Sequence, residues 1–598
     1  MAKLGHRRKG QLGKALMERA DATENLAGGL AFEIEDPSQR LLTMIGSSFF
    51  NEPTYYNPDP DEDNVDRQPV LKELTKSGKV NVKAVEELDD RSREIVQTAI
   101  EVAQSKEPRD LLALANWART ELHIRTTPQV MLSIAAAVKE TRKFVRTYCT
   151  KIIQRADELR DVFAFHRYFF GGLPASLKRG LGDAFASFKE YDFLKYDADT
   201  APRFRDVLLM IDRAKDWPVT KPVFEYLVNG KVIDEEATPL IAARKKLAAK
   251  EKFDSEAIEL AQAAQVTWEV LLSQFGKGED KKKLWEYLVT NKRLGYMAML
   301  RNLRNMLEAK VSSEVVDKIA ERLSDKEQVA KSRQLPFRFF SAYRVIGGDS
   351  IPVYAHWVGR RGRKAAKVKE ADVGPVLDAI DQALKHSADA LPQFPGTTAI
   401  FADNSGSMGS PVSAKSTITL ADAANLLCAL SQFCCARSVV GAFGTDVAIV
   451  RLSKAARIID NMMKVHIANT KGMSTNGYKV VQRLRKDNIK VDRVILLSDM
   501  QLWNDGSAEY DSYAHWNQEA YQFAPEWKKY LSSVNPKAVL HCVDLAGQGK
   551  AVTPAKEKNV NIVSGFSEKI LSRLAEFEGI GTKDEKPLPT IEYVRENY

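Results

Sequence analysis

Residues 401–410 read FADNSGSMGS, and this stretch decides the fold of the C-terminal half of the chain. It begins at the end of a short apolar run, Thr397 to Ala402, which follows Pro395 and Gly396. A short apolar run between turn-forming residues is typical of a buried parallel strand that ends in a loop. Because open α/β sheets bind ligands at the carboxyl ends of their strands, the loop after this strand is a candidate ligand site.

Three side chains of this loop offer oxygen ligands, namely the carboxylate of Asp403 and the hydroxyls of Ser405 and Ser407. A donor set made only of oxygen favours a hard divalent cation, and such small side chains leave room for waters and for an acidic group of a partner. We expect Mg²⁺ first, with Ca²⁺ and Mn²⁺ left open. A lone pattern of this kind also occurs as an ordinary helix-capping turn, so the assignment depends on further loops.

Two later segments supply those loops. Residues 491–499 form another apolar strand that ends in a carboxylate, and a Gly-containing loop between the two strands offers Ser474 or Thr475, of which we favour Thr475. The spacing and order of these loops resemble the metal-ion-dependent adhesion site of von Willebrand factor A domains. The ligand set implied by the resemblance is Asp403, Ser405, Ser407, Thr475 and Asp499.

The composition is that of an ordinary globular chain. Its 598 residues are 44% hydrophobic and 28% charged with a net charge of +9, which predicts about two to four domains and local basic patches. No run of eighteen apolar residues and no signal-peptide core is found, so we expect a cytoplasmic protein that does not enter a membrane. The five cysteines, an odd number, indicate reduced thiols.

Between residues 86 and 390 apolar residues recur at three- and four-residue spacing, which predicts helices. Segments such as 110–118 and 129–137 are each about one helix long, and pairs of them recur about every 40 residues, the period of HEAT and armadillo repeats. The expected product is a helical solenoid, whose usual work is binding.

These patterns predict a multidomain protein, an all-α HEAT-like array followed by a doubly wound α/β domain with a mainly parallel sheet. The expected parts are an irregular, partly ordered arm at 1–85, helical repeats at 86–390, the A-like domain at 391–580 and a tail at 581–598.

Several stretches of the helical part carry a second resemblance. They are Ser176–Gly182 (SLKRGLG), Phe193–Tyr196 (FLKY), Arg205–Leu209 (RDVLL), Met299–Met306 (MLRNLRNM) and Leu335–Phe337 (LPF). They resemble the landmarks of the TROVE module, and their order, with an A domain directly after them, is similar to the Ro autoantigen family of RNA-binding proteins. The resemblance extends from about residue 40 to residue 575.

The resemblance implies a monomeric ring of helical repeats, sealed by the A domain and without catalytic residues. Such a ring binds small non-coding Y RNAs on a basic outer face, takes single-stranded 3′ ends of misfolded RNAs into a central hole, and serves RNA quality control. Bacterial members are linked to exoribonucleases, including polynucleotide phosphorylase.

Positive charge recurs between residues 178 and 213, where it is interleaved with aromatic residues. Lys and Arg neutralise phosphates, whereas these aromatic residues are more simply explained as repeat core. The chain departs from some animal members, which place a His where we find Asp212 or Arg213. A second basic run lies at 360–369 and is equally typical of a solvated surface. The expected RNA-binding residues are Lys178, Arg179, Lys195, Tyr196, Arg203, Arg205 and Arg213.

Motifs of enzymes are missing from the sequence. It contains no GxxxxGK[ST] phosphate loop, no HExxH, no GxSxG elbow and no GxGxxG after a strand. A metal-dependent nuclease needs a cluster of carboxylates around its ions, which the A-like loops do not offer. We therefore predict a binding protein. The alternative is an adaptor whose A domain uses its cation to grip acidic residues of a protein partner, with the helices as a scaffold.

Overall fold

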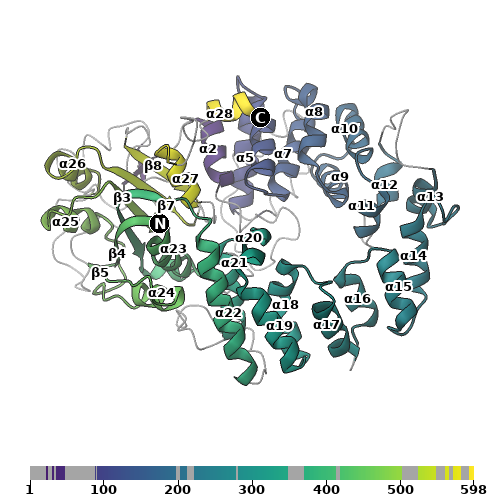
Figure 1. Ribbon diagram of the computed structural model, residues 1–598. Helices are drawn as coiled ribbons and strands as arrows, with labels where there is room; N and C mark the ends of the chain where they lie inside the picture. Colours follow the sequence, from purple (N-terminus) through teal and green to yellow (C-terminus); the bar gives the residue numbers. More distant parts are fainter. Residues whose placement is uncertain are drawn as a thin grey trace, which may run out of the picture.

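The computed structural model describes residues 22–24, 30–32, 36–46, 88, 90–196, 202–211, 221–277, 280–347, 370–412, 418–500, 523–546, 559–564, 570–580 and 591–598. Its helices run in a circuit, and an α/β domain lies between the two ends of that circuit (Figure 1). The predicted fold class, a HEAT-like helical ring followed by an A-type α/β domain, is confirmed. Within the described ranges, no helix has the length and apolar character needed to cross a bilayer.

The helical part consists of short helices that pack on their neighbours in sequence. The first half contains α2 (Pro37–Gly46), α5 (Asp90–Gln104), α6 (Asp110–Thr120), α7 (Thr126–Ala137), α8 (Arg142–Ile152), α9 (Ala156–Phe170), α10 (Ala175–Phe185), α11 (Glu190–Lys195), α12 (Phe204–Leu208) and α13 (Lys221–Asn229). The second half contains α14 (Pro239–Ala248), α15 (Ser255–Ala263), α16 (Trp268–Phe275), α17 (Asp280–Thr290), α18 (Tyr296–Glu308), α19 (Ser313–Ser324), α20 (Lys326–Ser332), α21 (Pro336–Gly347) and α22 (Glu370–Ala388). A small antiparallel hairpin, β1 (Ala22–Glu24) and β2 (Leu30–Phe32), precedes them.

The apolar spacing of the sequence becomes the buried face of these helices. In α10, Leu177, Leu181 and Phe185 recur four residues apart and are fully buried. Each such side chain contributes about 1.5–3 kcal/mol when it leaves water. Apolar burial of this kind holds each helix of the array against the next.

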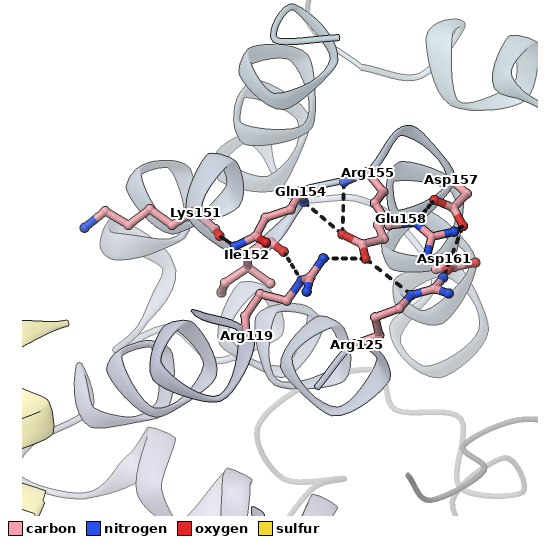
Figure 2. Close-up of polar contacts among 9 residues, drawn as sticks. All are labelled: Arg119, Arg125, Lys151, Ile152, Gln154, Arg155, Asp157, Glu158 and Asp161. Carbon is pink, nitrogen blue, oxygen red and sulfur yellow. Dashed lines mark hydrogen bonds and ion pairs between the residues drawn. The ribbon is translucent and has the colours of Figure 1, made fainter. Parts of the chain in front are cut away.

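Buried charges tie the early helices together (Figure 2). Glu158 in the first turn of α9 is fully buried, and its Oε1 accepts a hydrogen bond from Arg119 Nη2 at 2.9 Å. Its Oε2 accepts the backbone N–H of Gln154 at 2.8 Å, and Arg125 Nη2 reaches Asp157 Oδ2 at 3.1 Å. Because every charge has a partner, the desolvation cost of the cluster is offset. The cluster joins the ends of α6 and α8 to the start of α9.

The A-type domain is one six-stranded sheet with helices on both faces. Its strands are β3 (Phe394–Asp403), β4 (Cys435–Phe443), β5 (Val447–Val450), β6 (Arg493–Ser498), β7 (Val539–Asp544) and β8 (Val560–Ser564). The strand order is β5-β4-β3-β6-β7-β8, and all neighbours are parallel except β4 and β5. The helices are α23 (Leu420–Cys434), α24 (Ile458–His466), α25 (Tyr478–Lys486), α26 (Phe523–Ser533) and α27 (Ile570–Phe577).

Side chains of alternate residues in the central strand β3 pack on opposite faces of the sheet. Ala399 and Phe401 belong to the core beneath α25 and α26, whereas Ile400 and Ala402 belong to the core shared with α23, α24 and α27. The second core continues without interruption into α14–α22. The A domain and the second half of the helical array therefore share one hydrophobic core.

The first half of the array meets the A domain through different contacts. The guanidinium of Arg573 in α27 lies over the ring of Trp117 in α6, 4.6 Å from Cζ to the centroid. Within 581–598, where a tail was expected, the described residues form α28 (Ile591–Asn597), and Ile591 and Val594 join the core of the first helices. Arg595 of α28 forms an ion pair with Asp110 of α6 at 2.7 Å. The circuit is thus closed by the A domain and α28.

Candidate nucleic-acid interface and metal centre

The described members of the expected RNA-binding set lie on or directly beside α10, α11 and α12, three helices that pack beside α9 (Figure 1). Lys178 and Arg179 lie on α10, and Lys195 is the last residue of α11. Arg203 caps α12 and Arg205 lies in its first turn. The exposed members are Arg179, Lys195, Arg203 and Arg205; Lys178 and Tyr196 are half-buried, and Arg213 lies outside the described residues.

Tyr196 is held within a cluster of cations. Arg155 Cζ lies 4.5 Å from the centroid of its ring, and Lys195 Nζ lies 5.2 Å from it. Arg160 Nη2 donates to the Tyr196 carbonyl at 2.9 Å. Cations over an aromatic face are attracted by the ring quadrupole, so the ring of Tyr196 holds the side chains of Arg155 and Lys195 at this position.

Arg155 is fixed from its other side by the buried charges described above. Its Nε donates to Asp157 Oδ1 at 3.0 Å (Figure 2). Sequence reasoning missed Arg155 and Arg160, which precede Tyr196 by a full helix pair. In the sequence these residues are two arginines at the start of a helix. That local pattern does not reveal that both contact Tyr196, which lies more than thirty residues further along the chain.

The aromatic residues interleaved with these cations form the core of the repeat. The ring centroids of Phe185 and Phe193 are 4.5 Å apart, and those of Phe193 and Phe204 are 5.3 Å apart. All three side chains are buried. The interpretation as core is therefore confirmed for these phenylalanines, whereas Tyr191 and Tyr196 are half-buried.

The expected metal ligands are gathered in three loops at the carboxyl edge of the sheet. Asp403 is the last residue of β3, and its Oδ1 accepts the backbone N–H of Ser405 at 2.8 Å. Ser405 Oγ lies 3.3 Å from Ser407 Oγ. The loop with Ser474 and Thr475 lies against this first loop, because Gly406 N–H donates to the Met473 carbonyl at 3.2 Å.

Neighbouring strands explain why Asp499 joins them. β3 and β6 pair in parallel with Ala402 opposite Leu497, so the ends of both strands coincide. Ser498 Oγ consequently donates to Asp403 Oδ2 at 2.6 Å, a contact that the sequence reasoning missed. Thr475 is buried, but its burial does not decide whether Thr475 or Ser474 is the ligand from this loop.

The electrostatics of the loops fit a cation. Burial and the nearby charge of Asp499 raise the pKa of Asp403 to about 7. Two acidic groups held this close are stabilised by a positive ion, and the hydroxyls of Ser405 and Ser407 add neutral oxygen ligands. Across the described parts of the chain, no group of three or more His, Cys, Asp and Glu side chains forms a metal cluster. A donor set of carboxylate and hydroxyl oxygens such as this one would suit a hard cation.

Comparison with known proteins agrees with this architecture. The TROVE domain family matches residues 61–263 and 243–351. Telomerase protein component 1 of Rattus norvegicus is 25% identical over 320 residues, which cover 44% of this chain and 12% of that protein. The same component of Mus musculus is 27% identical over 323 residues, 45% of this chain and 12% of that protein. The chain therefore matches only a small part of the length of these relatives.

A solved structure is similar over nearly the whole chain. The crystal structure of Deinococcus radiodurans RO (RSR) protein superposes with a TM-score of 0.56 at 15% identity, covering 90% of this chain and 99% of that chain. At this level of identity the similarity shows the shared fold, both the helical circuit and the A-type domain. The helical part of the chain thus matches the TROVE domain family, and the fold of nearly the whole chain is similar to that of the Ro protein.

Proposed function

We propose that this chain is a non-catalytic RNA-binding protein of the Ro type that acts in the cytoplasm. The observation that carries the proposal is the group of exposed cations on α10, α11 and α12, supported by Arg155 and Arg160 around Tyr196. Lysine and arginine neutralise phosphates and release counterions, a contribution to affinity that does not depend on sequence. A rigid surface of this kind suits a structured RNA held through its backbone.

The RNA in this proposal is a small structured non-coding RNA, Y RNA or a relative of it. It would bind on the outer face of the ring, while single-stranded 3′ ends of misfolded RNA enter the central hole. The role would be RNA quality control. Polynucleotide phosphorylase or another exoribonuclease would be the partner that degrades the misfolded RNA. The closed helical circuit supports this division, because it has an outer and an inner face (Figure 1).

The A domain would contribute a divalent cation, with Mg²⁺ first and Ca²⁺ or Mn²⁺ as alternatives. Asp403, Ser405 and Ser407 would hold it from the first loop, with Thr475 and Asp499 from the other two. When bound, the ion would offer an open coordination position to the carboxylate of a partner. The buried carboxylate of Asp403 beside the charge of Asp499 supports this part of the proposal.

A second candidate function is an adaptor in which this cation grips an acidic protein partner. Two apolar side chains near the metal loops favour it: Met473 is 46% exposed and Ile467 is 70% exposed. Exposed apolar side chains beside an ion site would add contact area around a carboxylate. The helical array would then act as a scaffold.

The two functions are separated by what co-purifies with the chain. We expect the protein isolated from its own cells to have a ratio of absorbance at 260 nm to that at 280 nm well above that of pure protein, and crosslinked RNA to be recovered and sequenced. Absorbance of pure protein, without crosslinked RNA, would favour the adaptor.

A further inference from the structure

A hollow of about 540 Å³ lies between α9 and α12, next to the exposed cations of α12. It is lined by Phe163, Arg167, Pro202, Asp206, Leu209 and Met210. Sites for small ligands measure roughly 300–1,000 Å³ and combine apolar walls with a few polar groups. This hollow is wide open to solvent, and its volume falls within that range.

The walls of the hollow include apolar groups that meet solvent. Leu209 is 69% exposed, although it directly follows the buried residues Val207 and Leu208. Phe163 is buried on α9, and Met210 is half-buried beside it. A flat, apolar ligand face would cover Leu209 and remove its side chain from water.

Two charged residues of opposite sign line the same hollow. Arg167 Nη1 lies 3.8 Å from Met210 Sδ, a weak contact that leaves its other N–H groups for a ligand. Asp206 Oδ2 accepts the backbone N–H of Arg203 at 2.8 Å, and its Oδ1 lies 3.4 Å from Arg205 Nε. A carboxylate has about four acceptor sites, so Asp206 can accept further hydrogen bonds.

The surroundings of the hollow favour an anionic polymer over a neutral ligand. Arg203 and Arg205 are exposed and come from the same short helix as Asp206. Their positive charge would attract the phosphates of a strand whose base entered the hollow. Single-stranded RNA is recognised in this way, with a base lifted from its stack, packed on apolar or guanidinium groups and hydrogen-bonded at its edges.

We propose that this hollow binds one unpaired guanine of the bound RNA, an inference that rests on the proposed RNA-binding function. Guanine presents two neighbouring donors, N1–H and the N2 amino group, and two neighbouring acceptors, O6 and N7. Asp206 supplies only acceptors and Arg167 supplies only donors, so the pair matches both edges. Adenine, cytosine and uracil do not have both a pair of adjacent donors and a pair of adjacent acceptors.

The test uses the full chain and four labelled RNA octamers, uridine tracts with G, A, C or U at one central position. Fluorescence anisotropy at fixed salt should show the G octamer binding about tenfold more tightly than the others. Equal affinity for all four octamers would overturn the guanine pocket alone. A complete lack of binding to all four octamers would also overturn the pocket, whereas the RNA-binding function is tested separately by the affinity for structured RNA and its salt dependence.

Asp206→Asn separates base recognition from charge. Asparagine keeps an acceptor for the backbone N–H of Arg203, so α12 keeps its cap. The preference for G should fall to less than about twofold, while affinity for the U octamer stays equal or rises because a negative charge is removed. An unchanged preference for G in this variant would contradict the proposal.

Leu209→Gln tests the apolar wall with a matched control. Leu209 and Ile233 are both exposed, but only Leu209 lines the hollow. Leu209→Gln should weaken binding of the G octamer about fivefold or more, and Ile233→Gln should leave it unchanged. Equal effects of the two substitutions would overturn the assignment of Leu209 to a base-binding wall.

Discussion

Arg573 in α27 and Trp117 in α6 form a cation–π contact, with Cζ 4.6 Å from the ring centroid. The first residue belongs to the A domain and the second to the early helices of the array. Trp117 is buried, and the ring therefore closes through a packed contact as well as through charges. A cation–π pair removed from water is worth about 2 kcal/mol.

Closure of the ring also depends on Asp110, so we expect its substitution to lower the stability of the protein measurably. Its carboxylate is buried and accepts from Ser38 Oγ at 2.8 Å and from both Arg595 Nε and Nη2, at 2.8 and 2.7 Å. Asp110→Ala should lower the free energy of the first unfolding step in urea by about 1–3 kcal/mol, since its partners lose a charged acceptor.

The matched control for closure is Asp389→Ala. Asp389 pairs with Lys326 at 2.8 Å, but both side chains are more than half exposed. Exposed pairs contribute about 0–1 kcal/mol, so this substitution should leave the unfolding midpoint nearly unchanged. If both variants behaved alike, the ion pair between α6 and α28 would not stabilise the closed ring.

Metal binding should stabilise the A domain through Asp403. We expect Mg²⁺ at a concentration of 100 Kd to raise the free energy of unfolding of the wild type by about 2.7 kcal/mol, and so to raise its melting temperature. Asp403→Ala should abolish this rise. RNA affinity should stay within a few-fold of wild type, because the proposed phosphate contacts lie on the helical array. Differential scanning calorimetry with and without Mg²⁺ measures the first effect.

Asp446→Ala is the control for the metal site. This carboxylate follows β4 near the same edge, is partly exposed and pairs with Lys471 at 2.8 Å. The Mg²⁺-dependent rise should persist in this variant. A Mg²⁺-dependent rise that survives Asp403→Ala would contradict the assignment of the metal site. A loss of RNA binding in a folded Asp403→Ala variant would contradict the assignment of RNA binding to the helical array alone.

The carboxyl group of Asp161 on α9 should make the stability of the protein depend on pH. Burial, opposed by the charge of Arg125, raises the pKa of Asp161 from 3.8 to about 6. The folded state therefore holds this proton more tightly than the unfolded chain, and its contribution to stability, full below about pH 4, is lost as the pH rises to 6. The melting temperature of Asp161→Asn minus that of wild type should increase between pH 4 and pH 7.

Glu314→Gln provides a control of opposite sign. A hydrogen bond from Lys318 lowers the pKa of Glu314, so the corresponding difference in melting temperature should fall slightly as the pH rises. The effect should be small because the pair is exposed. A difference for Asp161→Asn that stays constant or falls would show that its carboxyl is not held in a protonated form by the fold.

Local patterns in the sequence were sufficient to predict the strand that ends at Asp403 and the loop that follows it in the candidate metal centre. Asp403 and Ser405 are two residues apart, so one turn brings the carboxylate to the backbone N–H of Ser405. The contact of Ser498 with Asp403 depends instead on the register of β3 against β6. No local pattern specifies a register between strands so far apart in the chain.

In the helical part, too, contacts between residues far apart in the chain are not visible in local patterns. Lys195 and Tyr196 were visible as neighbours, but Arg155 and Arg160, at the start of α9, reach Tyr196 only because α9 and α11 pack together. The helix α28 was not predicted, since Ile591 and Val594 form too short an apolar pattern. Its stability comes from packing on early helices, and packing partners are set by the tertiary fold.

The most direct test of the central claim is the salt dependence of RNA binding by the variant Lys178→Ala/Arg179→Ala/Lys195→Ala/Arg205→Ala. Each lost phosphate contact reduces the slope of log K against log[salt] by ~0.7–0.9, so we predict weaker binding of structured RNA and a slope smaller by about 3. The charge-matched control is Lys245→Ala/Lys246→Ala/Lys250→Ala/Lys252→Ala, at and just after the end of α14, which should keep the wild-type slope. Wild-type affinity and slope in a folded first variant, or equal losses in both variants, would contradict RNA binding at α10–α12.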